Sequence, residues 1–103
     1  MDRIERIKSF LASNPSDSFL QHALALEYIK LNEEEAARRL FEAILTRDPG
    51  YIGSYYHLGK LLERMNKIAL AIEWYEKGME QARAAGDMHA YQELRTAYEE
   101  ITE

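Results

Sequence analysis

The sequence predicts an all-α fold in which six antiparallel helices form a stack of helical hairpins. Three observations support this prediction. Apolar residues recur at the i, i+3, i+4 spacing of a helix along nearly the whole chain, and the alternation typical of a strand is nowhere sustained. Short runs rich in Asn, Asp, Pro and Gly divide the chain into six such segments. Several residue types return after 34 positions, which indicates an internal repeat.

The first three helices are each marked by an apolar stripe. Residues 14–17 end the first helix and offer a cap for the second, and Asn32 suits the left-handed position that follows the second helix. Residues 33–35 are glutamates, which the dipole of the third helix favours in its first turn. The three stripes contain Ile4, Ile7, Phe10 and Leu11, then Phe19, Leu20, Ala23, Leu24, Tyr28 and Leu31, then Ala37, Leu40, Phe41, Ile44 and Leu45.

Three further helices follow the turn at residues 48–50. The fourth helix ends at Asn66, and the fifth ends near residues 85–87. Their stripes, with that of the last helix, contain Tyr55, Leu58, Leu61, Leu62 and Met65, then Ile68, Ala71, Ile72, Tyr75 and Met79, then Tyr91, Leu94, Tyr98 and Ile101. We expect helices of 11–17 residues joined by short turns, with no linker between domains.

Composition and charge narrow the possible functions. The 103 residues suffice for one domain with a hydrophobic core. Because there is no cysteine, disulfides, thiolate metal sites and cysteine nucleophiles are excluded. The net charge of −5 argues against a nucleic-acid partner. The longest stretch without a charged side chain, residues 49–59, is too short to span a bilayer. The N-terminus lacks the apolar region of a signal peptide, so we expect a cytoplasmic protein without membrane insertion.

The repeat has a period of 34 residues. Five pairs of equal or similar residues share this separation: Pro15 and Pro49, Leu24 and Leu58, Asn32 and Asn66, Ala37 and Ala71, and Phe41 and Tyr75. Five coincidences at one period indicate that the helices form repeated hairpins rather than an irregular bundle.

With this pattern the chain resembles the tetratricopeptide repeat family. The motif residues of the family correspond to Gln21, Leu24, Ala25, Tyr28, Ala37, Phe41 and Pro49 in one repeat, and to Tyr55, Leu58, Gly59, Leu62, Ala71 and Tyr75 in the next. The resemblance implies a right-handed solenoid of about two and a half repeats. It also implies one domain over residues 1–103, with a partial repeat helix at 1–17, repeats at 18–51 and 52–85, and a capping helix at 86–103.

The small motif residues have a physical reason, and the departures from them are informative. Ala25 and Gly59 allow the second helix of the same hairpin to pack closely against the first. Arg3 occupies a small-residue position of the partial repeat, and Arg83 stands where the second repeat would have its proline. Arg95 occupies the small position of the last helix, so we expect a C-terminal cap whose outer face meets water.

We expect no enzyme and no cofactor. There is no glycine-rich phosphate loop, because the glycines around residues 50–59 are followed by no Lys-Ser or Lys-Thr pair, and there is no His-Glu-x-x-His motif. The three histidines come from three different helices, and no carboxylate stands at a fixed spacing to complete a metal site. We therefore expect no metal, although the histidines could act as a pH sensor.

The family register predicts a binding surface on the first helices of the hairpins, which line the concave side of such a solenoid. Phe19, Leu26, Ile29 and Tyr56 are apolar at positions of this face that should be exposed to solvent, and contiguous exposed apolar surface marks interaction sites. The alternative is that several of them are half-buried between layers. We expect a segment of a partner protein or peptide to bind there. The expected contact residues are Phe19, His22, Leu26, Ile29, Tyr56, His57, Lys60 and Arg64.

Two alternatives stay open for this surface. The same apolar patch could form a homodimer, in which each copy covers the other. The chain could also be a fragment of a longer repeat array, because three or more repeats are normally needed for stability. Trp74 lies on a second helix, toward the convex side, where the sequence predicts partly buried packing.

Overall fold

The computed structural model describes residues 2–103, and within them the chain forms six α-helices and no strand. They are α1 (Arg3–Ser13), α2 (Ser18–Lys30), α3 (Glu34–Arg47), α4 (Gly53–Arg64), α5 (Ile68–Ala85) and α6 (Met88–Thr102). Met1, the first residue of the expected partial repeat, lies outside the described residues. The prediction of an all-α fold with six helices is confirmed.

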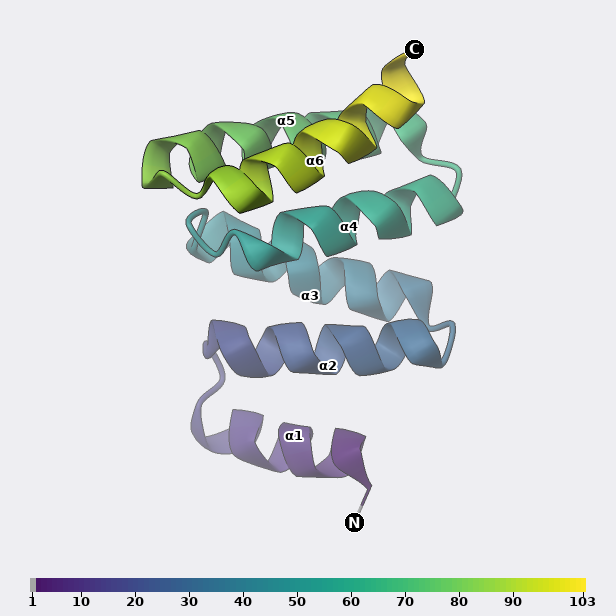
Figure 1. Cartoon of the computed structure of the whole chain (residues 1–103). Helices are drawn as coiled ribbons and strands as arrows, with labels where there is room; N and C mark the ends of the chain where they lie inside the picture. Colours follow the sequence, from purple (N-terminus) through teal and green to yellow (C-terminus); the bar gives the residue numbers. More distant parts are fainter. Residues whose placement is uncertain (1) are drawn as a thin grey trace.

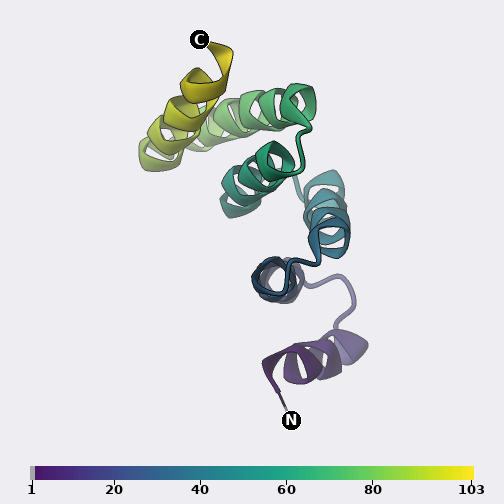
Figure 2. The same ribbon diagram turned by 90° about the vertical axis from the view of Figure 1, so that its right-hand side faces the viewer.

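The helices are stacked in order from one end of the molecule to the other, with the two termini at opposite ends (Figure 1). Each helix runs antiparallel to its neighbour in the chain. The view turned by 90° shows α2, α4 and α6 toward one side of the stack and α3 and α5 toward the other (Figure 2). The molecule is accordingly elongated, with principal extents of 44 × 29 × 19 Å. None of the helices in residues 2–103 has the length and apolar character required to cross a membrane.

Helix α5 is longer than the sequence analysis predicts. It has 18 residues, against the expected maximum of 17. Arg83 stands at the position where the preceding repeat has Pro49, so the backbone N–H that a helix needs is present and α5 continues. Gly86 then ends the helix in the left-handed conformation, with φ of 73°.

Two asparagines reverse the chain within the hairpins. Asn32 and Asn66 adopt left-handed φ angles of 59° and 61°, as the sequence predicts for Asn32. The amide that follows each asparagine reaches back to close the turn. Glu33 N–H donates to the carbonyl of Tyr28, and Lys67 N–H donates to that of Leu62, both at 2.9 Å. The period of 34 residues therefore reproduces the same turn in both repeats.

Replacement of either asparagine by alanine is expected to destabilise the fold by about 1 kcal/mol. The methyl group of alanine is unfavourable at positive φ, whereas glycine tolerates this conformation. We expect Asn32→Gly and Asn66→Gly to retain most of the wild-type stability. Urea unfolding of the four variants tests this expectation. Equal stability of the alanine and glycine variants at either turn would contradict it.

The core consists of small and large residues that interlock between helices. Ala25, Ala37 and Ala71 are completely buried. Gly59 is packed so closely that a Cβ atom built on it would lie 2.1 Å from the ring of Tyr75. The small motif positions are thus the places where helices of one hairpin approach most closely. The fully buried large side chains are Phe41, Ile44, Leu58, Leu61, Leu62, Tyr75 and Leu94.

The apolar stripe expected for the first helix is only partly buried. Ile7 is the one buried residue of α1, whereas Phe10, predicted on the same stripe, is 57% exposed. The reason is that, within residues 2–103, α1 packs substantially against α2 alone, while each inner helix has neighbours on two sides. Asp2 caps this helix by accepting a 2.8 Å hydrogen bond from Glu5 N–H.

Arg95 is exposed on the last described helix, and the expectation of a C-terminal cap stays a prediction. The side chain of Arg95 is 52% exposed and pairs with Glu99 at 3.1 Å, one turn further along α6. In residues 2–103 no helix packs against this side of α6, so the bulky charge meets water where a regular repeat would require a small residue.

Candidate functional site

The eight predicted contact residues lie on α2 and α4, and we call the side of the stack formed by α2, α4 and α6 the inner face. Phe19 and Arg64 are exposed there, and the side chain of Phe19 has 69% of its surface free. The others are half-buried. The expectation that Leu26, Ile29 and Tyr56 stand free in solvent is therefore wrong, because these side chains pack against the core between neighbouring helices.

The inner face contains a hollow of about 390 Å³ at its N-terminal end. Its polar rim is organised by Glu27, which accepts hydrogen bonds from Arg3 at 3.0 Å and from Lys30 at 3.1 Å. The hydrogen bond from Lys30, followed by that from Arg3, lowers the pKa of Glu27. We call this the groove hollow, and it is lined by Arg3, Phe19, His22, Ala23, Leu26, Glu27 and Lys30.

The lining of the groove hollow contains residues that the sequence analysis predicted as contact residues and residues that it did not. Phe19, His22 and Leu26 were predicted as contact residues. Arg3 was predicted as an irregular packing position, and Glu27 was not singled out. A salt bridge between residues 24 positions apart has no signature in a single sequence, so only the structure could bring Arg3 and Glu27 together.

His22 and His57 meet where α2 packs against α4. Nδ1 of His22 and Oγ of the buried Ser54 share a hydrogen bond of 2.8 Å. The two imidazole rings lie 5.3 Å apart, and the ring of His57 stacks on Phe41. Burial, together with the nearby charge of His57, lowers the pKa of His22 to about 4, and burial lowers that of His57. Both rings are therefore neutral packing elements at neutral pH.

The basic residues predicted on α4 are engaged in ion pairs. Lys60 Nζ lies 3.7 Å from Glu63 and 3.6 Å from Glu100, so it links α4 to α6. Arg64 pairs with Glu34 of α3 at 3.2 Å. A partner carboxylate would have to replace these internal acids to reach either side chain.

Glu63 also accepts a hydrogen bond from the hydroxyl of Tyr75. Burial and this carboxylate together raise the pKa of Tyr75. The hydroxyl of a buried core residue therefore has its partner on α4, and Glu63 is fixed from two sides, by Tyr75 and by Lys60. The middle of the inner face is a network that connects helices, whereas the groove hollow at its end is open.

Trp74 lies on α5, away from the helices of the inner face. The indole is half-buried, as predicted, and packs 6.2 Å from the ring of Tyr55. Nζ of Lys77 lies 4.5 Å from its centre, which is a cation–π contact. Within residues 2–103, no three His, Asp or Glu side chains gather closely enough to hold a metal ion.

Comparison with known proteins agrees with this architecture. A family model described as the tetratricopeptide repeat matches residues 20–51 and 52–84, which is more than half of the chain. The chain belongs to the tetratricopeptide repeat family. The solution structure of a tetratricopeptide repeat domain protein from Salinibacter ruber superimposes with a TM-score of 0.82. It is 41% identical, over 85% of this chain and 89% of that one.

Two relatives of this tetratricopeptide repeat chain differ greatly in the share of their length that it covers. A TPR repeat-containing protein of Pseudomonas aeruginosa is 26% identical over 88% of this chain and 87% of its own length. The aspartyl/asparaginyl beta-hydroxylase of Mus musculus is 29% identical over 71% of this chain. The chain spans only 10% of the length of that enzyme. The similarity to the hydroxylase therefore concerns a small part of a much larger protein.

Proposed function

We propose that the chain is a non-catalytic protein-binding module, a scaffold that holds a segment of a partner protein along its inner face. The observation that carries the proposal is the groove hollow beside the exposed ring of Phe19. Tetratricopeptide repeats are generally protein-interaction modules, and family membership supports this class of function. The binding-site residues, the domain division at residues 17, 51 and 85 and the cytoplasmic location stay predictions from the sequence.

The partner segment is expected to place an apolar side chain in the groove hollow. Leu26 and Ala23 form an apolar floor, and Phe19 stands at its edge. A hollow of about 390 Å³ falls within the range of sizes that can receive a side chain or small ligand. Arg3 and Lys30 at the rim are two positive charges that share the single carboxylate of Glu27. The rim therefore keeps an excess of positive charge, which would attract an acidic group of the partner.

The double variant Leu26→Gln/Lys30→Glu is expected to bind the partner with an affinity at least tenfold lower than that of the wild type. The first change makes the floor of the groove hollow polar, and the second reverses a rim charge. A pull-down from native lysate with wild type and the double variant identifies the partner. Titration of the purified partner then measures the loss of affinity.

A matched charge reversal on the opposite side, Glu73→Lys on α5, provides the control. Glu73 is exposed and lies far from the groove hollow in the helix stack. Circular dichroism must show equal helicity for all three proteins. If the partner binds both variants as tightly as the wild type, the groove hollow is not its site. Loss of binding by Glu73→Lys alone would place the site on the side of Trp74.

A second candidate is a homodimer that buries the inner-face patch. The exposed ring of Phe19 is the observation that favours it. Leu26→Gln/Lys30→Glu would then change the mass of the protein in solution and leave no separate partner to identify. Light scattering over a dilution series distinguishes this arrangement from binding of another protein.

A further inference from the structure

The first end of the stack has a second apolar hollow, which shares Arg3, Phe19 and Ala23 with the groove hollow and extends over α1. Helices α1 and α2 enclose a cleft of about 270 Å³, which we call the end cleft. Phe10 and Phe19 are the two most prominent side chains there, 57% and 69% exposed. Two arginines border the cleft. Its lining residues are Arg3, Arg6, Ile7, Phe10, Phe19, Leu20 and Ala23.

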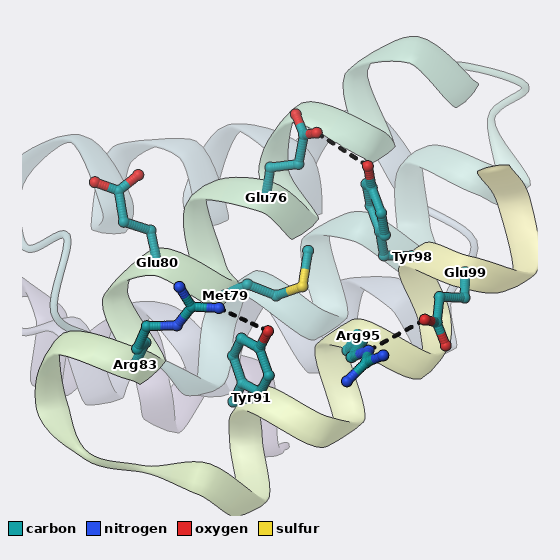
Figure 3. Close-up of a pocket in the computed structure, with 8 residues that line it drawn as sticks. All are labelled: Glu76, Met79, Glu80, Arg83, Tyr91, Arg95, Tyr98 and Glu99. Atoms are coloured by element: carbon teal, nitrogen blue, oxygen red, sulfur yellow. Dashed lines mark hydrogen bonds and ion pairs between the residues drawn. The ribbon is translucent and has the colours of Figure 1, made fainter.

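The other end of the stack has a hollow of about 470 Å³ between α5 and α6, which we call the tail hollow (Figure 3). Its two tyrosines are held in place: Arg83 donates a 2.8 Å hydrogen bond to Tyr91, and Tyr98 donates one of 3.2 Å to Glu76. Glu80 and Glu99 border it as well. No helix of residues 2–103 covers this side of α6.

The two ends are complementary in helix type. In the repeat register α1 is the second helix of a hairpin and α6 is the first helix of one. Within the chain, α4 packs against a second helix on each side, α3 and α5. Within residues 2–103, the second helix that packs against α6 is α5, and the helix that packs substantially against α1 is α2. The α6 of one molecule placed beside the α1 of another would complete a hairpin.

The charges of the two ends are also complementary. Helix α1 has three basic residues and one acidic residue, a net charge of +2. Helix α6 has one basic and three acidic residues, a net charge of −2. A symmetric contact between two end clefts would bring Arg3 and Arg6 of both molecules together, which is unfavourable. Contact between unlike ends avoids this repulsion and pairs opposite charges.

We propose that a second copy of this chain docks head to tail, with its tail hollow and α6 against the end cleft of the first copy. The contact is heterologous, so that it leaves one end cleft and one tail hollow free and can add further copies. Arg3 stands where the complete repeats have Ala37 and Ala71, and Arg95 stands where they have Ala25 and Gly59. The contact between two copies is therefore less closely packed than the contacts between repeats of one chain. We expect the association to increase with protein concentration and to weaken with salt.

Two variants block one end each, and their mixture tests the polarity of the contact. Arg6→Glu/Phe10→Ser alters the end cleft outside the groove hollow, and Glu80→Lys/Glu99→Lys alters the tail hollow. In sedimentation equilibrium from about 10 μM to 1 mM, the mass of the wild type is expected to rise above 12.0 kDa with concentration. Each variant alone remains monomeric. An equimolar mixture forms a dimer, because each variant keeps one intact end.

Three results would overturn the proposal. One is a wild type that stays at 12.0 kDa throughout. Another is a mixture that stays monomeric although both variants show wild-type helicity. The third is association of either variant on its own. The groove-hollow variant Leu26→Gln/Lys30→Glu is expected to associate like the wild type, so failure of the head-to-tail contact and failure of partner binding are measured separately.

Discussion

Gly59→Ala is expected to lower the stability of the fold by about 3 kcal/mol. A Cβ atom at this position would lie 2.1–2.7 Å from three ring carbons of Tyr75, distances at which one of the groups must move. Tyr75 cannot move easily, because its ring is completely buried and its hydroxyl is bound to Glu63. The helices α4 and α5 must then separate, which disturbs the hairpin at its closest approach. Thermal unfolding should shift down by roughly 4–8 °C for each kcal/mol lost.

The same substitution should become favourable once the ring is removed. In the background of Tyr75→Ala the added methyl group has space, and alanine is the better helix former by up to about 1 kcal/mol. Tyr75→Ala itself is expected to cost about 3–5 kcal/mol. Because this cost could unfold the protein, the effect of Gly59→Ala is best measured with Tyr75 and with Tyr75→Ala in a stabilising osmolyte such as sucrose. The sign of the effect of Gly59→Ala should reverse between them.

Two other glycines serve as matched controls. Gly53 begins the same helix, and a Cβ atom there would meet nothing within 4 Å, so Gly53→Ala should be neutral or slightly stabilising. Gly78 on α5 resembles Gly59, since its Cβ would lie 2.7 Å from Cβ of Tyr55, and Gly78→Ala should also destabilise. If Gly59→Ala were no worse than Gly53→Ala, close packing would not be the reason for the glycine.

The positions of closest packing could be predicted from the sequence because they depend on the period. The recurrence of Ala37 at Ala71 and of Phe41 at Tyr75 fixes which helices pair and where they approach. The turns follow for the same reason, since Asn32 and Asn66 occupy equivalent places. These features are properties of the repeat unit. A single sequence with two copies of the unit is enough to identify them.

The binding face could be predicted only in outline. The register places residues on the inner face, but exposure depends on side chains contributed by neighbouring repeats. Tyr56 and Leu26 were expected in solvent and are half-buried, because adjacent first helices lie close enough to pack them against the core. The ion pair of Lys60 with Glu100 joins helices from different repeats. The ion pairs that long flexible side chains form depend on the local geometry. The repeat period does not determine this geometry.

Acidification is expected to destabilise the fold through His22. Burial and the neighbouring His57 lower the pKa of His22 from its ordinary value of 6.5 to about 4, so the folded state holds this ring neutral. The unfolded chain binds the proton below about pH 6.5, whereas the folded protein binds it only near pH 4. Stability is thus unaffected at pH 7, falls as the pH drops from about 6.5, and stops falling from this cause below about 4.

The size of this effect is roughly 2 kcal/mol, after allowance for the partial exposure of the ring. His57 acts in the same direction, because burial also lowers its pKa, although Glu93 opposes the shift. Phe41, Tyr51 and the Ser54 hydroxyl lie against His22, and none of these three groups carries a charge between pH 4 and 7. They therefore offer no negative charge that would stabilise a protonated ring.

His22→Asn isolates this contribution. The amide can keep a hydrogen bond to Ser54 but does not titrate, so urea unfolding between pH 7.5 and 4 should show roughly 2 kcal/mol less loss than in the wild type. His89→Asn, at an exposed site at the start of α6, is the control and should follow the wild type. Parallel pH curves for His22→Asn and the wild type would exclude His22 as the cause. Because His22 also lines the groove hollow, a wild-type protein that loosens below pH 6 should release a partner held there, and His22→Asn should retain it.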